Sequence, residues 1–366
     1  MYPVALALAL ATAAVAQIAP PSFVPVELPL AGEPVRVASA RLDPGPTDDL
    51  VVLSRRSTGV YDLVTAGVVG STVDFKVHAG LAQLGYLNTP ELVASEVDGN
   101  AFADVGLTTL FLDQYLLGNG DLTLQGIAPL PTAGGSQYGV GFTDVDGDGW
   151  RDSVLLVNDF GGSYLDFGLN DGTGIFGAPN FVDAPGSGAG AEARLHFADV
   201  LGQGVDSTFV TRNVGLYRSQ WPAGPTTNEL LLAGDFAEVG SGDFDGVGGL
   251  DLAVCGRGSG RVSVLLNDGQ GGFQVATTYV TGRFPESLAI ADLDGDGDLD
   301  LAVANRRSSD VSILCNDGAG AFAACGTWPV GAQPRDITAG DLDGNGRVDL
   351  AVACEGSGTV TLLLGL

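Results

Sequence analysis

A short acidic segment recurs along this chain at steps near fifty residues. Its clearest copy, 292–300, alternates aspartate with leucine and glycine and runs directly into the apolar stretch 301–304. Full copies begin at Glu96, Asp144, Asp292 and Asp341, a partial copy begins at Asp243, and eroded copies begin at Arg41 and Asp199. The steps of 55, 48, 55, 44, 49 and 49 residues are long enough for four short strands with their turns, as in a propeller blade. The sequence therefore predicts seven repeated units in one domain.

Short strands separated by glycine-rich turns fill each unit. In the sixth unit, 287–291 alternates in polarity, 301–304 and 311–315 are apolar, and a further strand begins at Phe322 after Asn316-Asp317-Gly318-Ala319-Gly320. No segment between these strands has helical periodicity. We therefore expect an all-β fold of four-stranded blades.

The two ends of the chain complement one another. The seventh unit stops after its third strand, 359–364, while 23–29 followed by Gly32-Glu33-Pro34 resembles 322–329 followed by Gly331-Ala332-Gln333-Pro334. A first strand that pairs with the last blade would remove the exposed sheet edges of a linear array. The prediction is a seven-bladed β-propeller over residues 20–366, closed by this N-terminal strand.

Composition limits the partners and the location. The chain has 44 Asp and Glu against 16 Lys and Arg, and a net charge of -28 argues against nucleic acid or an anionic membrane as a partner. The apolar run 4–15 and the cleavage pattern Ala14-Val15-Ala16 predict a signal peptide, 1–16, and a secreted or cell-surface protein. That run is too short to span a membrane, and no later segment is long enough.

Few residues offer catalytic chemistry. His78 and His196 are the only histidines, and both lie in strand-like contexts, where a hydrogen-bonded structural role is expected. Of the four cysteines, Cys315 and Cys325 flank a hairpin loop and could form a disulfide, whereas Cys255 and Cys354 are expected to stay unpaired. The aromatic residues Tyr138, Trp150, Tyr217, Trp221 and Trp328 are candidates either for a binding face or for packing between blades.

Two motifs carry a family resemblance. The pattern Asp-x-Asp-Gly-x-Gly-x-x-Asp-Leu-Ala-Val, followed by Asn-Asp-Gly-x-Gly-x-Phe, resembles the FG-GAP/VCBS repeats of integrin alpha-subunit propellers and of many secreted bacterial proteins. The resemblance implies a propeller whose acidic loops hold Ca²⁺, a hard cation that takes six to eight oxygen ligands. The family includes adhesins, carbohydrate binders and propellers attached to enzymes, so the resemblance does not fix one function.

The resemblance also implies ligands, which we number by loop position from the first acidic residue. In the sixth unit these are side-chain oxygens of Asp292, Asp294, Asp296 and Asp300 with the backbone carbonyl of Asp298. The corresponding residues are Asp144, Asp146, Asp148, Trp150 and Asp152; Asp341, Asp343, Asn345, Arg347 and Asp349; Glu96, Asp98, Asn100, Phe102 and Asp104; and Asp243, Asp245, Gly249 and Asp251. Four to five Ca²⁺ ions per chain are therefore expected.

Departures from the repeated pattern predict which loops bind a cation well and which bind weakly or not at all. Gly295 and Gly297 are expected at positive φ, and in the second unit Ala101 replaces the second of these glycines. Val247 stands where the fifth unit needs an oxygen, so that site should be weaker. The first and fourth loops are not expected to bind, and the Arg41 side chain could instead neutralise Asp43 and Asp49.

Other interpretations of the loops are weaker. Solvent-facing Asp-Gly turns need no metal, but turn chemistry alone does not explain four copies in the same phase. An EF-hand would need a glutamate at its twelfth position, where the sixth unit has Val303, and would need flanking helices. Magnesium demands a stricter octahedral geometry.

We expect a non-catalytic binding or adhesion module for an extracellular protein or carbohydrate. Candidate recognition residues in the loops of the opposite face are Arg55, Arg56, Arg257, Arg261, Arg306, Arg307 and Asp310, although solvated turn residues are the alternative interpretation. The alternative function is a polysaccharide lyase or hydrolase working in the central channel. No nucleophile or histidine constellation supports that alternative.

Overall fold

The computed structural model describes residues 21–366, apart from 58–59, 70–71, 84–90, 96–99, 110–111, 120, 122–123, 131–135, 160–161, 173–174, 179, 184–192, 205 and 220–227. The predicted signal peptide, 1–16, lies outside the described residues. The described residues form strands and no helix, as the alternating and β-branched runs predict.

The strands assemble into four-stranded antiparallel sheets. In sequence order of their first strands, the sheets are β2 (Glu33–Ala40), β3 (Asp49–Arg55), β4 (Val60–Val69) and β5 (Thr72–Gln83); β6 (Glu91–Ser95), β7 (Asp104–Thr109), β8 (Leu112–Gly118) and β9 (Leu124–Pro129); β10 (Ser136–Thr143), β11 (Asp152–Asp159), β12 (Gly162–Gly168) and β13 (Asn180–Asp183); β14 (Arg194–Ala198), β15 (Ser207–Arg212), β16 (Gly215–Ser219) and β17 (Asn228–Ala233); β18 (Phe236–Gly242), β19 (Asp251–Gly256), β20 (Arg261–Asn267) and β21 (Phe273–Val280); β22 (Pro285–Ala291), β23 (Asp300–Asn305), β24 (Asp310–Asn316) and β25 (Phe322–Pro329); and β26 (Pro334–Gly340), β27 (Asp349–Cys354) and β28 (Thr359–Gly365) with β1 (Phe23–Pro29).

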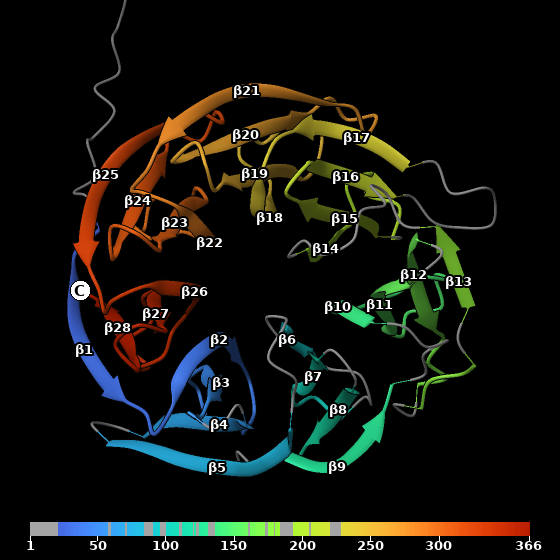
Figure 1. Ribbon diagram of the computed structural model, residues 1–366. Coiled ribbons are helices and arrows are strands. Elements are labelled where there is room, and N and C mark those ends of the chain that lie inside the picture. The colour runs from blue at the N-terminus through green and yellow to red at the C-terminus, as the bar shows by residue number, and fades with distance from the viewer. Residues whose placement is uncertain are drawn as a thin grey trace, which may run out of the picture.

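The sheets stand around a ring, with β2, β6, β10, β14, β18, β22 and β26 nearest its centre (Figure 1). Within six of the sheets the strands follow chain order from the centre outward. In the remaining sheet, β1 pairs antiparallel with β28, from Phe23 opposite Gly365 to Pro29 opposite Thr359. The prediction of an all-β propeller is confirmed.

Apolar side chains pack between neighbouring sheets. The second strand of a sheet is covered on both faces, and every residue of β23 is buried. One core cluster joins Val264 and Val303 from neighbouring sheets, and another joins Val52 and Ala351, so the sheet ending in β28 packs on the sheet beginning with β2. Since each sheet buries its faces against two neighbours, the ring needs no separate central core.

This arrangement separates the loops onto two faces. The acidic loops join the first strand of a sheet to the second, as 292–299 joins β22 to β23. The turns between second and third strands, such as 306–309, lie at the other end of the same strands. The first strands also carry bulges, for example between Pro285 and Ser287 and between Pro334 and Asp336.

Candidate metal centres

Glycines at positive φ turn the acidic loops of the third to seventh units. Gly295 and Gly297 have φ of 81° and 95°, as predicted, and the corresponding glycines of the third and seventh units have similar values. A left-handed backbone is unfavourable for a residue with a Cβ. Ala101 nevertheless adopts φ of 71° in the second unit, so that loop keeps the turn at a cost in strain.

The carboxylate at the first position organises the loop. Asp292 accepts backbone N–H groups from Gly295 at 2.7 Å and from Gly297 at 3.0 Å, one on each oxygen. Asp144 and Asp341 bind the corresponding glycine N–H groups of their own loops in the same way. These bonds hold the loop curled around its acidic side chains.

The ninth position combines a charge with full burial. Asp300 begins β23 and accepts the N–H of Leu293 on one oxygen at 2.9 Å and that of Asn316 on the other at 2.9 Å. Asp251 and Asp349 make the equivalent pairs of bonds. Each aspartate therefore ties its loop to the end of the third strand of the same sheet.

Burial destabilises the charged form of the carboxylates at the ninth position. It raises the pKa of Asp300 to about 6, although the two N–H bonds oppose the shift and the charge of Asp294 adds to it. Burial likewise raises the pKa of Asp152, Asp251 and Asp349. A raised pKa means that the ionised form is destabilised, and a bound cation would offset this cost.

The structure gathers the predicted ligands into groups whose ligand atoms lie within 4.8 Å of one another. In the third, fifth and seventh units the groups join the first, third and ninth positions: Asp144, Asp146 and Asp152; Asp243, Asp245 and Asp251; and Asp341, Asp343 and Asp349. In the sixth unit, Asp292, Asp294 and Asp296 form one group, and Asp294 also approaches Asp300. Carboxylate oxygens converging at this spacing fit a hard divalent cation.

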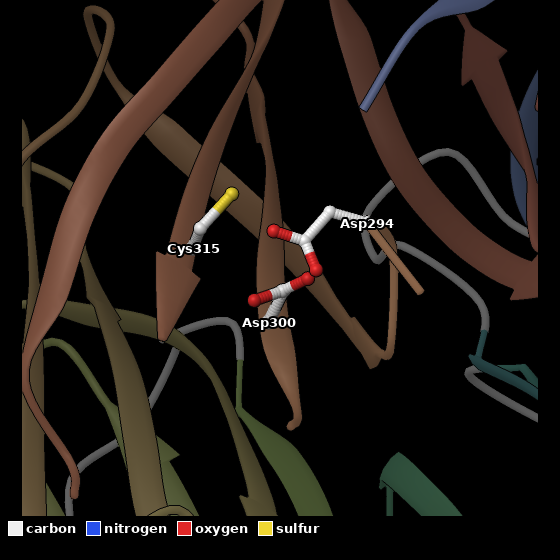
Figure 2. A group of neighbouring side chains, drawn as sticks. All are labelled: Asp294, Asp300 and Cys315. Carbon is white, nitrogen blue, oxygen red and sulfur yellow. The ribbon is translucent and has the colours of Figure 1, made fainter. Parts of the chain in front are cut away.

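Figure 2 shows three side chains of the sixth unit. The carboxylates of Asp294 and Asp300 point toward one another, and Cys315 lies beside them. Cys315 forms a disulfide with Cys325, so its sulfur is not available as a metal ligand. The oxygen set of the loop is therefore the part suited to a cation.

Several predicted ligands lie outside these groups. Asp148 and Asp298 belong to none of the carboxylate groups found among the described residues. Asn345 accepts the Arg347 N–H through its amide oxygen and donates to the Gly365 carbonyl at 3.0 Å. The resemblance assigned only backbone carbonyls to Trp150, Phe102 and Gly249, and the side chain of Trp150 is exposed.

The second loop is described only in part. Glu96 and Asp98 lie outside the described residues, whereas Asn100 donates to the Gly118 carbonyl at 2.9 Å and Asp104 accepts the Gly118 N–H at 2.8 Å. In the fifth loop, Val247 is exposed at the position where an oxygen was expected. The prediction of a weaker fifth site remains a prediction.

The first loop differs from the prediction. Arg41 is exposed, and its Nε donates at 3.4 Å to the backbone carbonyl of Asp43, with no carboxylate ion pair to it in the described part of the chain. Asp49 instead accepts the N–H groups of Leu42 and Asp43, and burial raises its pKa to about 6. The expected ion pair of Arg41 with Asp43 and Asp49 was wrong because the long arginine side chain turns toward the loop backbone.

An asparagine at the end of the third strand links neighbouring sheets. This link was not predicted from the sequence. Asn267 donates to the carbonyl of Val200 at 2.8 Å, and Asn316 donates to that of Phe244 at 2.8 Å. Both acceptors are second-position residues in the acidic loop of the preceding unit. The signal available in the sequence was the recurring Asn of Asn-Asp-Gly, which also fits an ordinary turn.

The unpaired cysteines are buried, and His196 is hydrogen-bonded within the fold. Cys255 and Cys354 are free and buried, as predicted. His196 Nε2 lies 2.9 Å from Ser241 Oγ, and desolvation lowers the pKa of His196 to about 4, so the ring is neutral at pH 7. The side chain of His78 lies outside the described part of the chain.

The aromatic residues predicted either to bind a ligand or to pack between blades have different surroundings. Trp328 packs edge-on against Phe23 with ring centroids 5.2 Å apart, which is the packing role expected of it. Tyr217 is half-buried in β16. Trp221 and the side chain of Tyr138 lie outside the described residues.

A polar network spans the centre of the ring. Its members lie five residues before the start of an acidic loop: Arg194, Glu238, Ser287 and Asp336. Arg194 on β14 binds Glu238 at 2.8 Å and approaches Asp336 on β26 at 3.4 Å, and Ser287 donates to Asp336 at 2.9 Å. Since β14 and β26 belong to sheets that are not neighbours in the ring of Figure 1, the contact of Arg194 with Asp336 links strands across the centre of the ring.

Comparison with known families identifies the repeat. A model of the FG-GAP-like repeat matches residues 243–303 and 292–352, two spans that each contain acidic loops described above. Residues 243–352 carry FG-GAP-like repeats. The matched FG-GAP-like spans include the loops of the fifth, sixth and seventh units, so the resemblance stated from the motifs is confirmed for a β-propeller of this kind. The comparison with curated proteins found no match.

Solved structures share the propeller fold of this chain. An Agrocybe aegerita lectin, described as recognising non-reducing terminal N-acetylglucosamine, has 17% identity and a TM-score of 0.59, with 94% of this chain and 86% of that chain covered. BBS1N, solved in complex with ARL6DN, has 13% identity and a TM-score of 0.63, with 94% and 96% covered. A Lactobacillus plantarum protein has 13% identity and a TM-score of 0.57, with 83% and 86% covered.

Proposed function

We propose that the protein is an exported, calcium-binding propeller that acts as a non-catalytic binding module for a carbohydrate or protein ligand. The observation that carries the proposal is the convergence of three carboxylates in one loop after another, within 4.8 Å in each group. Like charges at such separations repel one another unless a cation or protons lie among them. Repetition of this arrangement through the ring supports a shared structural role for the ions.

Calcium would be held mainly by the first, third and ninth positions of each loop, with the fifth and seventh completing the shell. When bound, it would supply positive charge between the carboxylates and take no part in a reaction. The loop residues themselves join the first strand to the second, so a bound ion would stiffen the face of the propeller that carries the loops. We expect four to five ions, with the fifth unit the weakest.

The proposal treats each four-stranded sheet as one of seven blades, with β1 closing the ring. It is supported by the pairing of β1 with β28 and by the place of Phe23 in a core cluster shared by the last two sheets. Export is supported by the apolar N-terminal run, and the expected mature N-terminus is Gln17. Sequencing the N-terminus of protein secreted with residues 1–16 present would test this cleavage.

A binding role is favoured over channel catalysis by the engagement of the channel carboxylates. Asp336 accepts bonds from Ser287 and from the Val37 N–H, and Glu238 pairs with Arg194. Charges neutralised in this way are poor general acids or bases. Among described residues, no helix has the length and apolar character to cross a membrane. The lectin of similar fold supports a carbohydrate as one class of ligand.

Arrays of glycans and of extracellular matrix proteins, probed with protein in calcium and in chelator, test the proposal. We expect selective, calcium-dependent retention without any change in the bound ligand. Mass spectrometry of the eluted ligand would reveal turnover. Cleavage of an arrayed polysaccharide would replace the binding role with that of a lyase or hydrolase, and retention of nothing would remove the binding role.

A further inference from the structure

Arginines gather on the face opposite the acidic loops. Arg306 and Arg307 lie in the turn between β23 and β24, and Arg283 lies with Phe284 in the connection from β21 to β22. Arg55, at the end of β3, reaches the same region through a shared carboxylate described below. We name Arg55, Arg283, Arg306 and Arg307, together with Phe284, the arginine surface.

Backbone bonds hold two parts of this surface together. The Arg306 N–H donates to the Phe284 carbonyl at 2.9 Å, and the Arg307 N–H donates to the Arg283 carbonyl at 3.0 Å. Ser308 Oγ accepts the Arg283 N–H at 2.9 Å. The arginine side chains therefore project from a fixed base and not from a loose loop.

Phe284 has an unusual conformation at the middle of the surface. Its φ is 63°, a left-handed value that is rare for an aromatic residue and unfavourable in energy. The Arg307 guanidinium lies over its ring, with Cζ 4.5 Å from the centroid. This cation–π contact holds the exposed guanidinium in one orientation.

One carboxylate orients the arginines at the inner side of the surface. Glu355 binds Arg55 at 2.9 Å, Arg306 at 3.1 Å and the buried Arg335 at 3.3 Å. Glu33 gives Arg55 a second partner at 2.7 Å. Arg283 and Arg307 are both exposed, and neither has a carboxylate within 4.0 Å among the described residues.

The local charge is opposite in sign to that of the chain. The four arginines of the surface and Arg335 carry five positive charges, whereas Glu33 and Glu355, which pair with three of them, and Asp310 of the neighbouring turn carry three negative charges, which leaves +2. The whole chain carries -28. A strand of six residues such as β23 spans about 20 Å, more than twice the Debye length of about 8 Å at physiological salt. Screening therefore separates this surface from the acidic loops at the other end of the strands.

We propose that the arginine surface binds the carboxylate of an acidic sugar unit, such as a uronic acid in a glycan. The inference rests on the proposed carbohydrate-binding function and specifies its ligand class. The paired N–H groups of a guanidinium match the two oxygens of a carboxylate, and Arg283 and Arg307 have these donors free of carboxylate partners within the described chain.

A single acidic sugar fits better than an extended polyanion. The excess charge here is only +2, whereas a nucleic acid would bring many phosphates toward a chain of net charge -28. The Phe284 ring adds an apolar surface beside the charges, which suits the apolar face of a sugar ring.

Calorimetric titration with oligosaccharides tests the inference. The probes are trigalacturonate, a glucuronate-terminated trisaccharide and a sialic acid-terminated trisaccharide, each compared with its carboxyl methyl ester and with an acidic peptide. The variants are R283A/R307A and R307K, and the matched control is R41A, an exposed arginine outside the proposed sites. Thermal unfolding of each variant checks that it folds.

The wild-type protein should bind at least one acidic sugar at least about tenfold more tightly than its ester, because a hydrogen bond to a charged group is lost on esterification. R283A/R307A should lose about tenfold or more in that affinity, R307K should lose less, and R41A should match the wild type. Raising salt from 50 to 500 mM should weaken binding.

Three outcomes would overturn the inference. They are equal affinity for acid and ester, wild-type affinity in a folded R283A/R307A variant, and binding of the acidic peptide but of no acidic sugar. Retention of neutral glycans alone on the arrays would overturn the inference and leave the proposed function in place. Absence of any ligand on the arrays would overturn both.

Discussion

At the scale of single residues, the ninth loop position carries two roles that can be separated. Asp300 accepts two backbone N–H groups while fully buried, whereas Asp296 in the same loop is exposed. In chelator, Asp300→Ala should lower the free energy of unfolding by about 2–4 kcal/mol, because two buried N–H groups lose their acceptor. Asp296→Ala should change it by less than about 0.5 kcal/mol.

Urea denaturation of both variants in the presence of chelator measures this difference. Calcium should then separate wild type from Asp296→Ala, because that variant removes a proposed ligand and leaves the buried bonds intact. Equal losses for the two variants in chelator would contradict the structural role assigned to Asp300.

Asp49 predicts how stability depends on pH without involving a proposed metal site. Burial raises its pKa from 3.8 to about 6, so the folded state holds this proton more tightly than the unfolded state does. Its stabilising contribution is therefore complete below about pH 4 and is lost as the pH rises through 6. Between pH 4 and 7, the free energy of unfolding of Asp49→Asn should fall by about 1 kcal/mol less than that of wild type.

Denaturation curves for both proteins at several pH values within this range provide the measurement. Groups elsewhere titrate in both proteins, so the difference between the two slopes is the informative quantity. Parallel curves would show that Asp49 keeps an ordinary pKa in the folded protein.

At the scale of elements, the hairpin asparagines Asn267 and Asn316 join their sheets to the preceding ones. Asn267 donates to Val200 at 2.8 Å and to Leu250 at 3.1 Å, and its oxygen accepts the Gly269 N–H. Asn267→Ala should cost about 2–3 kcal/mol, since it leaves buried carbonyls without a donor. Gln270→Ala, at an exposed position of the same hairpin loop, is the matched control and should be nearly neutral.

Thermal unfolding of the two variants reports this contribution. Amide hydrogen exchange adds a local readout, because loosening between the sheets should speed exchange around Val200 as well as around the substituted loop. A neutral Asn267→Ala variant would reduce the asparagine to an ordinary turn residue.

At the scale of the whole molecule, the proposed closure of the ring depends on the packing of β1 against the last two sheets. Phe23 on β1 is buried against Trp328, while Val24 beside it is exposed. If β1 closes the ring, Phe23→Ala should cost about 3 kcal/mol, the usual penalty for truncating a buried phenylalanine, and Val24→Ala should cost less than 1 kcal/mol, as roughly expected on a surface. A small effect of Phe23→Ala in urea denaturation would show that β1 is dispensable.

Repetition explains what the sequence could predict. The acidic loop and the run Leu-Ala-Val recur in fixed phase, so the all-β propeller fold and the positions of the loops followed from the pattern. Carboxylates at alternate positions also identified the first, third and ninth positions, whose side chains lie within 4.8 Å of one another in the third, fifth and seventh units, but not which of the remaining positions would join them.

Features without repetition could not be predicted in the same way. The channel network uses a different residue in each sheet, such as Arg194, Ser287 and Asp336, so no motif reveals it. Arg41 was misassigned because spacing along a loop does not determine the rotamer of a long side chain. The bonds from Asn267 and Asn316 to the preceding sheet follow from the assembled ring and not from local sequence.

Calcium titration of the chelator-treated protein by calorimetry tests the central claim most directly. Extracellular calcium modules bind in the range of about 10⁻⁴–10⁻³ M, so the titration should extend to about 10 mM. The account predicts four to five ions per chain, and fewer when Asp292 and Asp294 are replaced by asparagine. Absence of binding throughout that range, or an unchanged stoichiometry in the variant, would contradict it.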